Sequence, residues 1–193
     1  MDYALVLAGG LGQRLWPISR KQNSTKEAVD IHSQTMLELT VSRLSKWVGK
    51  DRIWIVSSKD IETYGCKLIK EPFRKNTAAA ISWGLSMIAS FDKDAFVGIF
   101  PVDHLISPWE SVVDALNEAK SAGKITALAI ELPPKKASKQ YGYLKTINGG
   151  VLGRVEDFVE KPSKPEELLQ AGYYVNSGIY AAPAKKLLAE IRR

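Results

Sequence analysis

The feature that most constrains the fold is an alternation of short apolar runs with amphipathic stretches of helical period. The first run, YALVLA at residues 3–8, is followed by a loop and then by MLELTVSRLSKWV at residues 36–48. Apolar residues of the second stretch recur at helical spacing, at Leu37, Val41, Leu44 and Val48. The same alternation continues in RIWIVSS (52–58), TAAAISWGLSMIAS (77–90), AFVGIF (95–100) and a helix that begins near Trp109. Alternating strands and helices predict a mostly parallel, doubly wound α/β sheet.

Local signals place the ends of several elements. Ser107 and Glu110 form a Ser-x-x-Glu capping box with Pro108 at the first helical position. After residues 125–132 the pattern changes, because YLKTIN and VLGRVEDFVE flank Gly149 and Gly150, which is typical of a two-residue hairpin turn. PEELLQAG predicts a short helix, YYVNSGIYAA a strand and AKKLLAEIRR a final helix. An antiparallel section is therefore expected toward the C-terminus.

Composition narrows the class of ligand. The chain has 193 residues, enough for one domain, and 27 Lys and Arg against 21 Asp and Glu give a net charge of +6. A basic surface suits an anionic partner. The basic residues are spread along the chain and no helix carries a recognition stripe, so a small phosphorylated ligand is favoured over nucleic acid.

Cysteine content and hydropathy indicate the compartment. Cys66 is the single cysteine, which excludes an internal disulfide framework and predicts a buried thiol. The apolar run at residues 3–8 is too short for a signal peptide, and no run reaches membrane-spanning length. We therefore expect a soluble cytoplasmic protein without a membrane partner.

The segment LAGGLGQRLWP is a candidate phosphate-binding turn. Gly9, Gly10 and Gly12 allow positive φ and close approach of backbone N–H groups to an anion, and Arg14 adds a fork of donors. A P-loop would end in Gly-Lys-Ser/Thr, and the dinucleotide fingerprint needs a third glycine where Leu15 stands. An NAD-dependent oxidoreductase is disfavoured, while a merely tight strand-to-helix turn stays open.

Six collinear blocks resemble a known family. They are LAGGLGQRLWPISR, EPFRKNTAAAI (71–81), FPVDH (100–104), YGYL (141–144), FVEKP (158–162) and VNSGIY (175–180). Together they resemble the sugar-phosphate nucleotidyltransferases, and more narrowly the mannose-1-phosphate guanylyltransferases (GDP-mannose pyrophosphorylases). The resemblance implies a Rossmann-like doubly wound mixed sheet of the glycosyltransferase A-like type, with residues 1–193 forming a single nucleotidyltransferase domain.

The implied reaction makes GDP-mannose and pyrophosphate from GTP and mannose 1-phosphate with Mg²⁺. The sugar phosphate oxygen attacks the α-phosphorus and pyrophosphate leaves in line. A phosphate monoester has its second pKa near ~6, so the nucleophile is largely dianionic at neutral pH and needs no general base. Catalysis then rests on positioning and on neutralising charge, and the lack of a nucleophilic triad in the sequence agrees with this.

By resemblance, Arg14 and Lys26 contact the triphosphate and Asp103 holds Mg²⁺. Lys26 lies in TKEAV where the family usually has Pro-Lys-Gln-Phe-Leu, and Lys21 is a competing candidate. Asp103 directly follows the AFVGIF strand, at the end of a strand where open α/β sheets place ligands. Its alternative role is to cap the next helix, for which Ser107 is better placed.

The resemblance also implies two sets of binding residues. The nucleotide set is Leu7, Ala8, Gly9, Gly10, Gly12, Glu71, Pro72, Asn76 and Thr77. The sugar-phosphate set is Tyr141, Gly142, Glu160, Lys161 and Asn176. Asn76 or Thr77 is also a suitable N-cap, a role compatible with nucleotide contact. Adjacent strand residues face opposite ways, so Glu160 and Lys161 can share a ligand only if the strand breaks near Pro162; otherwise they are an exposed pair at a strand end.

The chain departs from the family pattern in two places. Family members usually continue and supply a second carboxylate near the metal, and we expect residues 1–193 to lack this C-terminal continuation. A two-carboxylate metal site is then incomplete unless Asp157, Glu160 or a neighbouring subunit supplies the second carboxylate. Val175 stands where the family usually has Trp, which we expect to loosen the sugar site. Another sugar 1-phosphate or nucleotide, and a non-catalytic nucleotide-sugar-binding or regulatory homologue, therefore stay open. The family commonly associates, so a homo-oligomer is expected.

Overall fold

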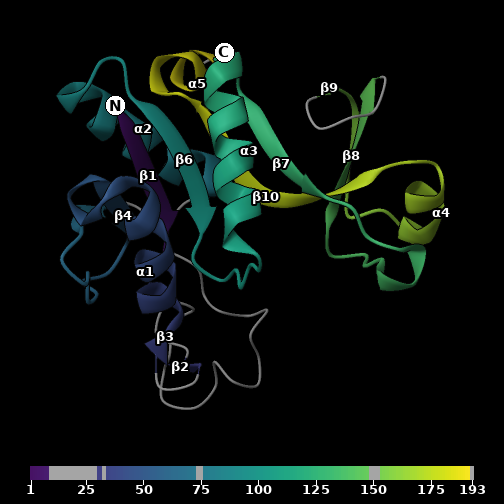
Figure 1. Ribbon diagram of the computed structural model, residues 1–193, viewed down its shortest axis with the longest axis horizontal. Coiled ribbons are helices and arrows are strands. Elements are labelled where there is room, and N and C mark those ends of the chain that lie inside the picture. The colour runs from purple at the N-terminus through teal and green to yellow at the C-terminus, as the bar shows by residue number, and fades with distance from the viewer. Residues whose placement is uncertain (9–29, 32–33, 73–75, 148–152, 192–193) are drawn as a thin grey trace. The chain divides into compact units, whose positions relative to one another are not determined.

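The computed structural model describes residues 1–8, 30–31, 34–72, 76–147 and 153–191 (Figure 1). The chain divides into two compact units. Unit 1 comprises Met1–Thr126 with Tyr180–Arg193, and unit 2 comprises Ala127–Ile179. The prediction that residues 1–193 form a single nucleotidyltransferase domain stays a prediction.

Unit 1 is built on parallel strands that run in the order β5-β4-β1-β6. These strands are β1 (Asp2–Leu7), β4 (Ile53–Ser57), β5 (Lys67–Lys70) and β6 (Phe96–Pro101). The C-terminal part of β10 (Tyr174–Pro183) pairs antiparallel with β6, from Tyr180 opposite Ile99 to Pro183 opposite Phe96. The predicted mostly parallel sheet with an antiparallel addition toward the C-terminus is confirmed.

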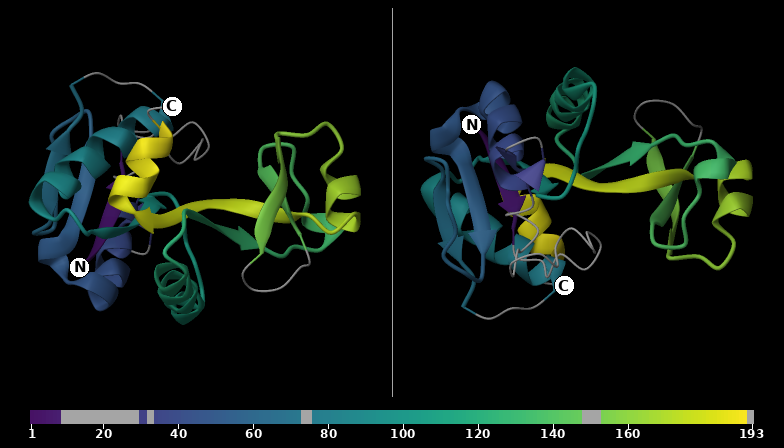
Figure 2. Two further views of the ribbon diagram at one scale, coloured as in Figure 1. Left: turned by 90° about the horizontal axis from the view of Figure 1, so that it is seen from above. Right: turned by 90° about the horizontal axis from the view of Figure 1, so that it is seen from below.

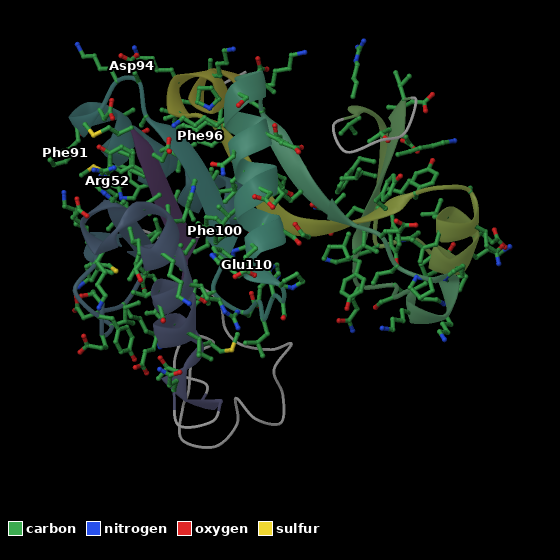
Figure 3. The ribbon with its side chains drawn as sticks, viewed as in Figure 1. Arg52, Phe91, Asp94, Phe96, Phe100 and Glu110 are labelled. Atoms are coloured by element: carbon green, nitrogen blue, oxygen red, sulfur yellow. The ribbon has the colours of Figure 1, made fainter. Side chains whose placement is uncertain are left out.

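Helices cover both faces of this sheet, because its central strands are apolar on both sides. Tyr3 and Leu5 face a core formed with α2 (Thr77–Phe91) and α5 (Ala184–Ile191), two helices that pack against each other (Figures 1 and 2). On the other face lie α1 (Met36–Val48) and α3 (Trp109–Ala122). Phe100 of β6, labelled in Figure 3, has its ring 6.1 Å from Trp47 of α1 and 6.1 Å from Trp109 of α3.

Two helices begin at side-chain caps. Thr35 Oγ1 accepts a hydrogen bond from Glu38 N–H at 3.0 Å at the start of α1, and Asn76 Oδ1 accepts one from Ala79 N–H at 3.1 Å at the start of α2. Each bond satisfies an N–H that the helix itself leaves unpaired. The capping role predicted for Asn76 is therefore confirmed.

The capping box predicted at Ser107 and Glu110 is wrong. The N-cap residue of α3 is Pro108, with φ −74° and ψ 144°, and no side chain caps this helix. Because Pro108 is extended and not helical, the helix begins at Trp109, one residue later than the motif requires. Sequence patterns also missed β5 and the short pair β2 (Asp30–Ile31) and β3 (Gln34–Thr35).

Unit 2 contains an antiparallel hairpin of β8 (Gly142–Ile147) and β9 (Arg154–Glu160), as predicted. The predicted Gly149–Gly150 turn lies outside the described residues. The N-terminal part of β10 pairs with β8, and β7 (Thr126–Ile130) pairs with β10. Two short helices, η5 (Pro134–Lys136) and α4 (Pro165–Gln170), complete the unit, and the remaining 3-10 turn, η4 (Lys50–Arg52), belongs to unit 1.

Tyr143 lies at the centre of unit 2 and is fully buried. Its hydroxyl accepts a hydrogen bond from Ser138 N–H and donates one to Ser138 O, each at 2.9 Å. A buried phenol oxygen without partners would be costly, so these bonds allow the ring to occupy the interior. In unit 1, burial raises the pKa of the Cys66 thiol, which is buried as predicted.

Among the described residues, none of the helices has the length and apolar character needed to cross a lipid bilayer.

The contact between α2 and β1 predicts that Gly84→Ala destabilises unit 1. An added Cβ would lie 2.6 Å from Leu5 Cδ1, 2.7 Å from Leu5 Cδ2 and 3.0 Å from Val56 Cγ2. Overpacking a core costs about 1–3 kcal/mol, more than the gain in helix propensity of about 0.5–1 kcal/mol from alanine. Urea unfolding should show a net loss on the order of 1 kcal/mol.

The matched test combines Gly84→Ala with Leu5→Val, which removes the clashing methyl ends. The combined loss in the free energy of unfolding should be smaller than the sum of the two single losses. Additive losses would show that the contact between Gly84 and Leu5 is not the cause.

Candidate active site

The carboxyl ends of the parallel strands form one continuous edge. Ala8 N–H donates to Val56 O at 2.9 Å, Glu71 N–H to Ser57 O at 2.9 Å, and Val102 N–H to Leu7 O at 3.4 Å. These bonds extend the ladder by one residue beyond β1, β5 and β6. We call Ala8, Ser57, Glu71 and Val102–Asp103 the carboxyl edge. Open α/β sheets bind ligands at this end of their strands.

One edge of one sheet therefore contains four predicted site residues that lie on separate segments of the sequence, Leu7, Ala8, Glu71 and Asp103. Leu7 ends β1 and Ala8 follows it, while Glu71 and Pro72 follow β5. Ala8 is 1% exposed and Glu71 is 9% exposed, so the edge offers mainly backbone groups near β1. The structure brings these residues together as the alternating pattern of strands requires.

Asp103 is half-buried in the turn that follows β6. A carboxylate oxygen is the ligand type that Mg²⁺ prefers, and Mg²⁺ is usually held by one or two carboxylates together with substrate phosphates and water. Among the described residues, no group of three or more His, Cys, Asp or Glu side chains could hold a metal ion by itself. The donor set fits a metal shared between Asp103 and phosphate oxygens.

The N-terminus of α2 follows the carboxyl edge along the chain. Asn76 and Thr77 are exposed there, and α2 runs for 15 residues. The N-terminus of a helix carries a partial positive charge and N–H groups that favour anions. The cap uses the Oδ1 of Asn76, so the Asn76 side chain can offer a ligand its NH2 donors, beside the Thr77 hydroxyl.

Unit 2 brings four of its predicted residues together at the start of β8 and the end of β9. Gly142 is paired with Glu160, and Lys161 N–H donates to Tyr141 O at 3.1 Å. Val175 of β10 pairs with Tyr143, so Asn176 comes opposite Gly142 on the other side of β8. Residues directly opposite each other point to the same face of a sheet. We call Gly142, Phe158, Glu160 and Asn176 the Gly142 face.

The bare glycine at 142 is required by the neighbouring side chains. A Cβ at this position would lie 2.7 Å from Phe158 Cζ and 2.8 Å from Glu160 Oε2. The ring and the carboxylate therefore fill the space that a side chain at residue 142 would occupy. Gly142 contributes by letting Glu160 lie close over the strand.

Lys161 provides the break in the strand that Glu160 and Lys161 would need in order to share a ligand. Its φ is +48°, in the left-handed region that side chains other than glycine rarely adopt. This turn lets two consecutive side chains approach each other, and Lys161 Nζ lies 3.6 Å from Glu160 Oε1. Both side chains are 58% exposed, so they are available to a ligand in solvent. A strained residue in an exposed charged pair is typical of a functional site.

The side chain of Asn176 bends the strand next to it. Its Oδ1 accepts a hydrogen bond from Gly178 N–H at 3.1 Å, and Gly178 has φ +74°. Val175 is only 4% exposed, pairs with Tyr143 and, by strand alternation, faces away from Asn176. Val175 therefore does not line the Gly142 face, and its effect on the sugar site stays a prediction.

Five of the predicted site residues lie outside the described residues. They are Gly9, Gly10, Gly12, Arg14 and Lys26. Their roles in binding the triphosphate stay predictions.

A comparison with protein families decides the class of the chain. The family described as Nucleotidyl transferase matches residues 3–192. The chain belongs to the nucleotidyl transferase family.

Individual relatives of this nucleotidyl transferase agree with that membership. The chain is 30% identical over 214 residues to the alginate biosynthesis protein AlgA of Pseudomonas putida, covering 100% of this chain and 44% of that protein. It is 31% identical over 206 residues to the mannose-1-phosphate guanylyltransferase of Sinorhizobium fredii, covering 96% of this chain and 40% of that protein. The chain thus spans less than half the length of these curated relatives.

A solved structure shows the same fold. A protein described as mannose-1-phosphate geranyltransferase from Thermus thermophilus superposes with a TM-score of 0.86 at 32% identity. The match covers 100% of this chain and 60% of that protein. The predicted fold class, a doubly wound mixed sheet of the nucleotidyltransferase type, is confirmed.

Several residues near the site were missed by the sequence analysis of this nucleotidyl transferase. Ser57 is 1% exposed at the carboxyl end of β4, where its Oγ accepts a hydrogen bond from Lys59 N–H at 3.1 Å. Phe158, which precedes Glu160 by two residues in the FVEKP motif, is 48% exposed on the Gly142 face. Strand alternation from Glu160 would have placed Phe158 on the same face.

Asp157, a possible substitute for the family's second carboxylate, is already engaged. Its Oδ2 accepts a hydrogen bond from the Tyr173 hydroxyl at 2.6 Å, and its Oδ1 accepts one from Phe158 N–H at 2.8 Å. The hydrogen bond to Asp157, followed by burial, raises the pKa of Tyr173. The register between Asp157 and Glu160 is regular, because the shift at Lys145/Thr146 falls at Glu156, before Asp157. By alternation Asp157 therefore lies on the face of the hairpin opposite to Phe158 and Glu160.

The strained backbone of Lys161 predicts an unusual order of stabilities. A left-handed conformation costs an L-residue roughly 1–2 kcal/mol, so Lys161→Gly should be more stable than Lys161→Ala by about 1 kcal/mol. Lys185 in α5 is the matched control, because Gly in a helix is less stable than Ala by about 1 kcal/mol. Urea unfolding of the four variants measures both differences. If Gly is no better than Ala at position 161, the backbone there is not strained.

Proposed function

We propose that this nucleotidyl transferase forms GDP-mannose and pyrophosphate from GTP and mannose 1-phosphate. The observation that carries the proposal is the carboxyl edge, where Ala8, Glu71 and Asp103 come after β1, β5 and β6, three parallel strands of one sheet. The guanylyl and mannosyl parts rest on the names of the relatives and on the motif at residues 71–81.

Unit 1 would bind the nucleotide. The base and ribose would lie against Glu71 and Pro72, with Asn76 and Thr77 at the N-terminus of α2. The backbone at Leu7 and Ala8 leads into the glycine-rich turn, whose Arg14, with Lys26, would contact the phosphates. A helix N-terminus and cationic side chains both neutralise phosphate charge, which is the main task of a site for phosphoryl transfer.

Unit 2 would bind the sugar 1-phosphate. The Glu160 carboxylate would accept hydrogen bonds from sugar hydroxyls, and the Asn176 amide can both donate and accept. Lys161 would place its ammonium group at the 1-phosphate, and Tyr141 holds the Lys161 backbone through its carbonyl. The exposed Phe158 ring beside Glu160 offers an apolar surface to the C–H groups of the sugar.

In the reaction, an oxygen of the sugar 1-phosphate forms a bond to the α-phosphorus of GTP. The bond between the α-phosphorus and the bridging oxygen to the β-phosphate breaks, and that oxygen leaves with pyrophosphate. The attacking phosphate is already deprotonated, so no protein base is required. Mg²⁺, held by Asp103 and phosphate oxygens, would supply charge neutralisation at the reacting phosphates. The chain's own residues orient both phosphates and neutralise their charge.

The direct test is pyrophosphate release with Mg²⁺ and mannose 1-phosphate, repeated with GTP, ATP, UTP, CTP and dTTP. We expect turnover with GTP and much less with the other nucleotides. Glucose 1-phosphate in place of mannose 1-phosphate tests the sugar. Turnover with a different pair would assign another member of the family's reactions. Binding of GTP or GDP-mannose, seen as a raised melting temperature, without turnover would identify a binding homologue.

Asp103→Asn should lower kcat by about 100-fold or more, because one preorganised charge at a transition state is worth roughly 100- to 1000-fold. The amide keeps the size of the side chain but loses the charge that attracts a cation. Asp114→Asn on the exposed face of α3 is the matched control and should keep full activity. Equal activity of both variants would remove Asp103 from the site.

A further inference from the structure

Helix α1 makes two hydrogen bonds to the turn that carries Asp103. Thr40 Oγ1 donates to Val102 O at 3.3 Å, and Arg43 Nη1 donates to His104 O at 3.4 Å. The two acceptor carbonyls belong to the residues immediately before and after Asp103. No motif in the sequence points to either donor, since they are 62 and 61 residues away from their acceptors.

The two donors share one face of α1. Residues three apart on a helix are neighbours, so Thr40 and Arg43 reach the same turn. The helix itself is fixed by Leu37, Val41 and Leu44, which are 2%, 2% and 0% exposed. A donor on a helix anchored in this way has a fixed position relative to the sheet below it.

The backbone before Asp103 is held from both sides. Val102 N–H donates to Leu7 O of β1, and Val102 O accepts from Thr40. The Val102 carbonyl lies in the peptide plane that leads into Asp103, and the His104 carbonyl lies in the plane that leads out of the next residue. The plane that leads into Asp103 is bonded, and the chain is held again one residue beyond it, so the range of directions open to the Cα–Cβ bond of Asp103 is reduced.

Thr40 is suited to this role by its burial. It is 8% exposed, and its hydroxyl is shared between Met36 O at 2.8 Å and Val102 O at 3.3 Å. The hydroxyl proton can form a bifurcated hydrogen bond, with the Met36 carbonyl in the same helix and the Val102 carbonyl in the distant turn as its two acceptors. Arg43 is half-buried and carries several N–H donors, so its bond to His104 O leaves other donors available.

We infer that Thr40 and Arg43 are positioning residues that hold the Asp103 carboxylate in the orientation that a metal-bound triphosphate requires. This inference rests on the proposed function, because it assigns the task for which the orientation is needed. The two side chains act through the backbone of the turn and touch no reacting atom. A misplacement of about 1 Å in such a site can cost on the order of 100-fold in rate.

The test compares Thr40→Val, which removes the hydroxyl and keeps the shape, with Thr40→Ser, which restores the hydroxyl. Arg43→Met provides a second, independent removal of one bond. Ser45→Ala is the matched control, since Ser45 is on the same helix but its hydroxyl donates to Ser42 O within α1. Each variant is assayed for kcat, for KM with GTP and mannose 1-phosphate, and for the Mg²⁺ concentration that gives half-maximal rate.

We expect Thr40→Val and Arg43→Met to lower kcat by about 10- to 100-fold and to raise the Mg²⁺ requirement. The KM for mannose 1-phosphate should stay unchanged, because its proposed residues belong to unit 2. Thr40→Ser and Ser45→Ala should behave as wild type. If the two removals lower the melting temperature but leave kcat and the Mg²⁺ requirement at wild-type values, the residues are only structural and the inference is wrong.

A readout that does not depend on turnover is amide hydrogen exchange of residues 103–106 in the ligand-free protein. Thr40→Val and Arg43→Met should speed exchange in this turn, while Ser45→Ala should not. Unchanged exchange would overturn the inference even if the proposed function holds. Conversely, wild-type protein that neither turns over nor binds any nucleoside triphosphate would overturn the proposed function and the inference with it, whatever the exchange rates show.

Discussion

The parallel hydrogen-bonded ladder of β5, β4, β1 and β6 is the constraint on which unit 1 depends. Its register runs one residue beyond the strands, through the bonds of Ala8, Glu71 and Val102. Because parallel strands all point the same way, residues that follow each strand must meet at one edge. Residues separated by more than 60 positions thereby become neighbours of one candidate nucleotide site, and helices on both faces keep the edge rigid.

Much of the fold could be predicted because the apolar pattern is strong in the buried elements. The stripe from Leu37 to Val48 matches α1, and Asn76 caps α2 as its residue type favours. β5 was missed because it is a short edge strand in which only Ile69 is buried, so it has no apolar run. The Ser107 cap failed because the extended backbone of Pro108 overrides a local side-chain motif.

The sequence named residues for the candidate site but did not predict the contacts that these residues make. A ligand shared by Glu160 and Lys161 would need a break in the strand, and the positive φ of Lys161 provides one. The sequence placed Gly142 in the sugar-phosphate set but did not show that Phe158 and Glu160 fill the space above it. The contacts of Thr40 and Arg43 could not be predicted, because a helical stripe says which residues are buried but not which distant carbonyl a buried hydroxyl reaches.

The central claim is that a nucleoside triphosphate binds at the carboxyl edge of the parallel strands. The most direct measurement is the change in backbone ¹H–¹⁵N chemical shifts when GTP and Mg²⁺ are added to the labelled protein. The account predicts the largest changes at Ala8, Glu71, Thr77 and Asp103, with little change at the opposite ends of the same strands, such as Ile53, Lys67 and Phe96. Changes concentrated at those opposite ends, or none in unit 1, would contradict it.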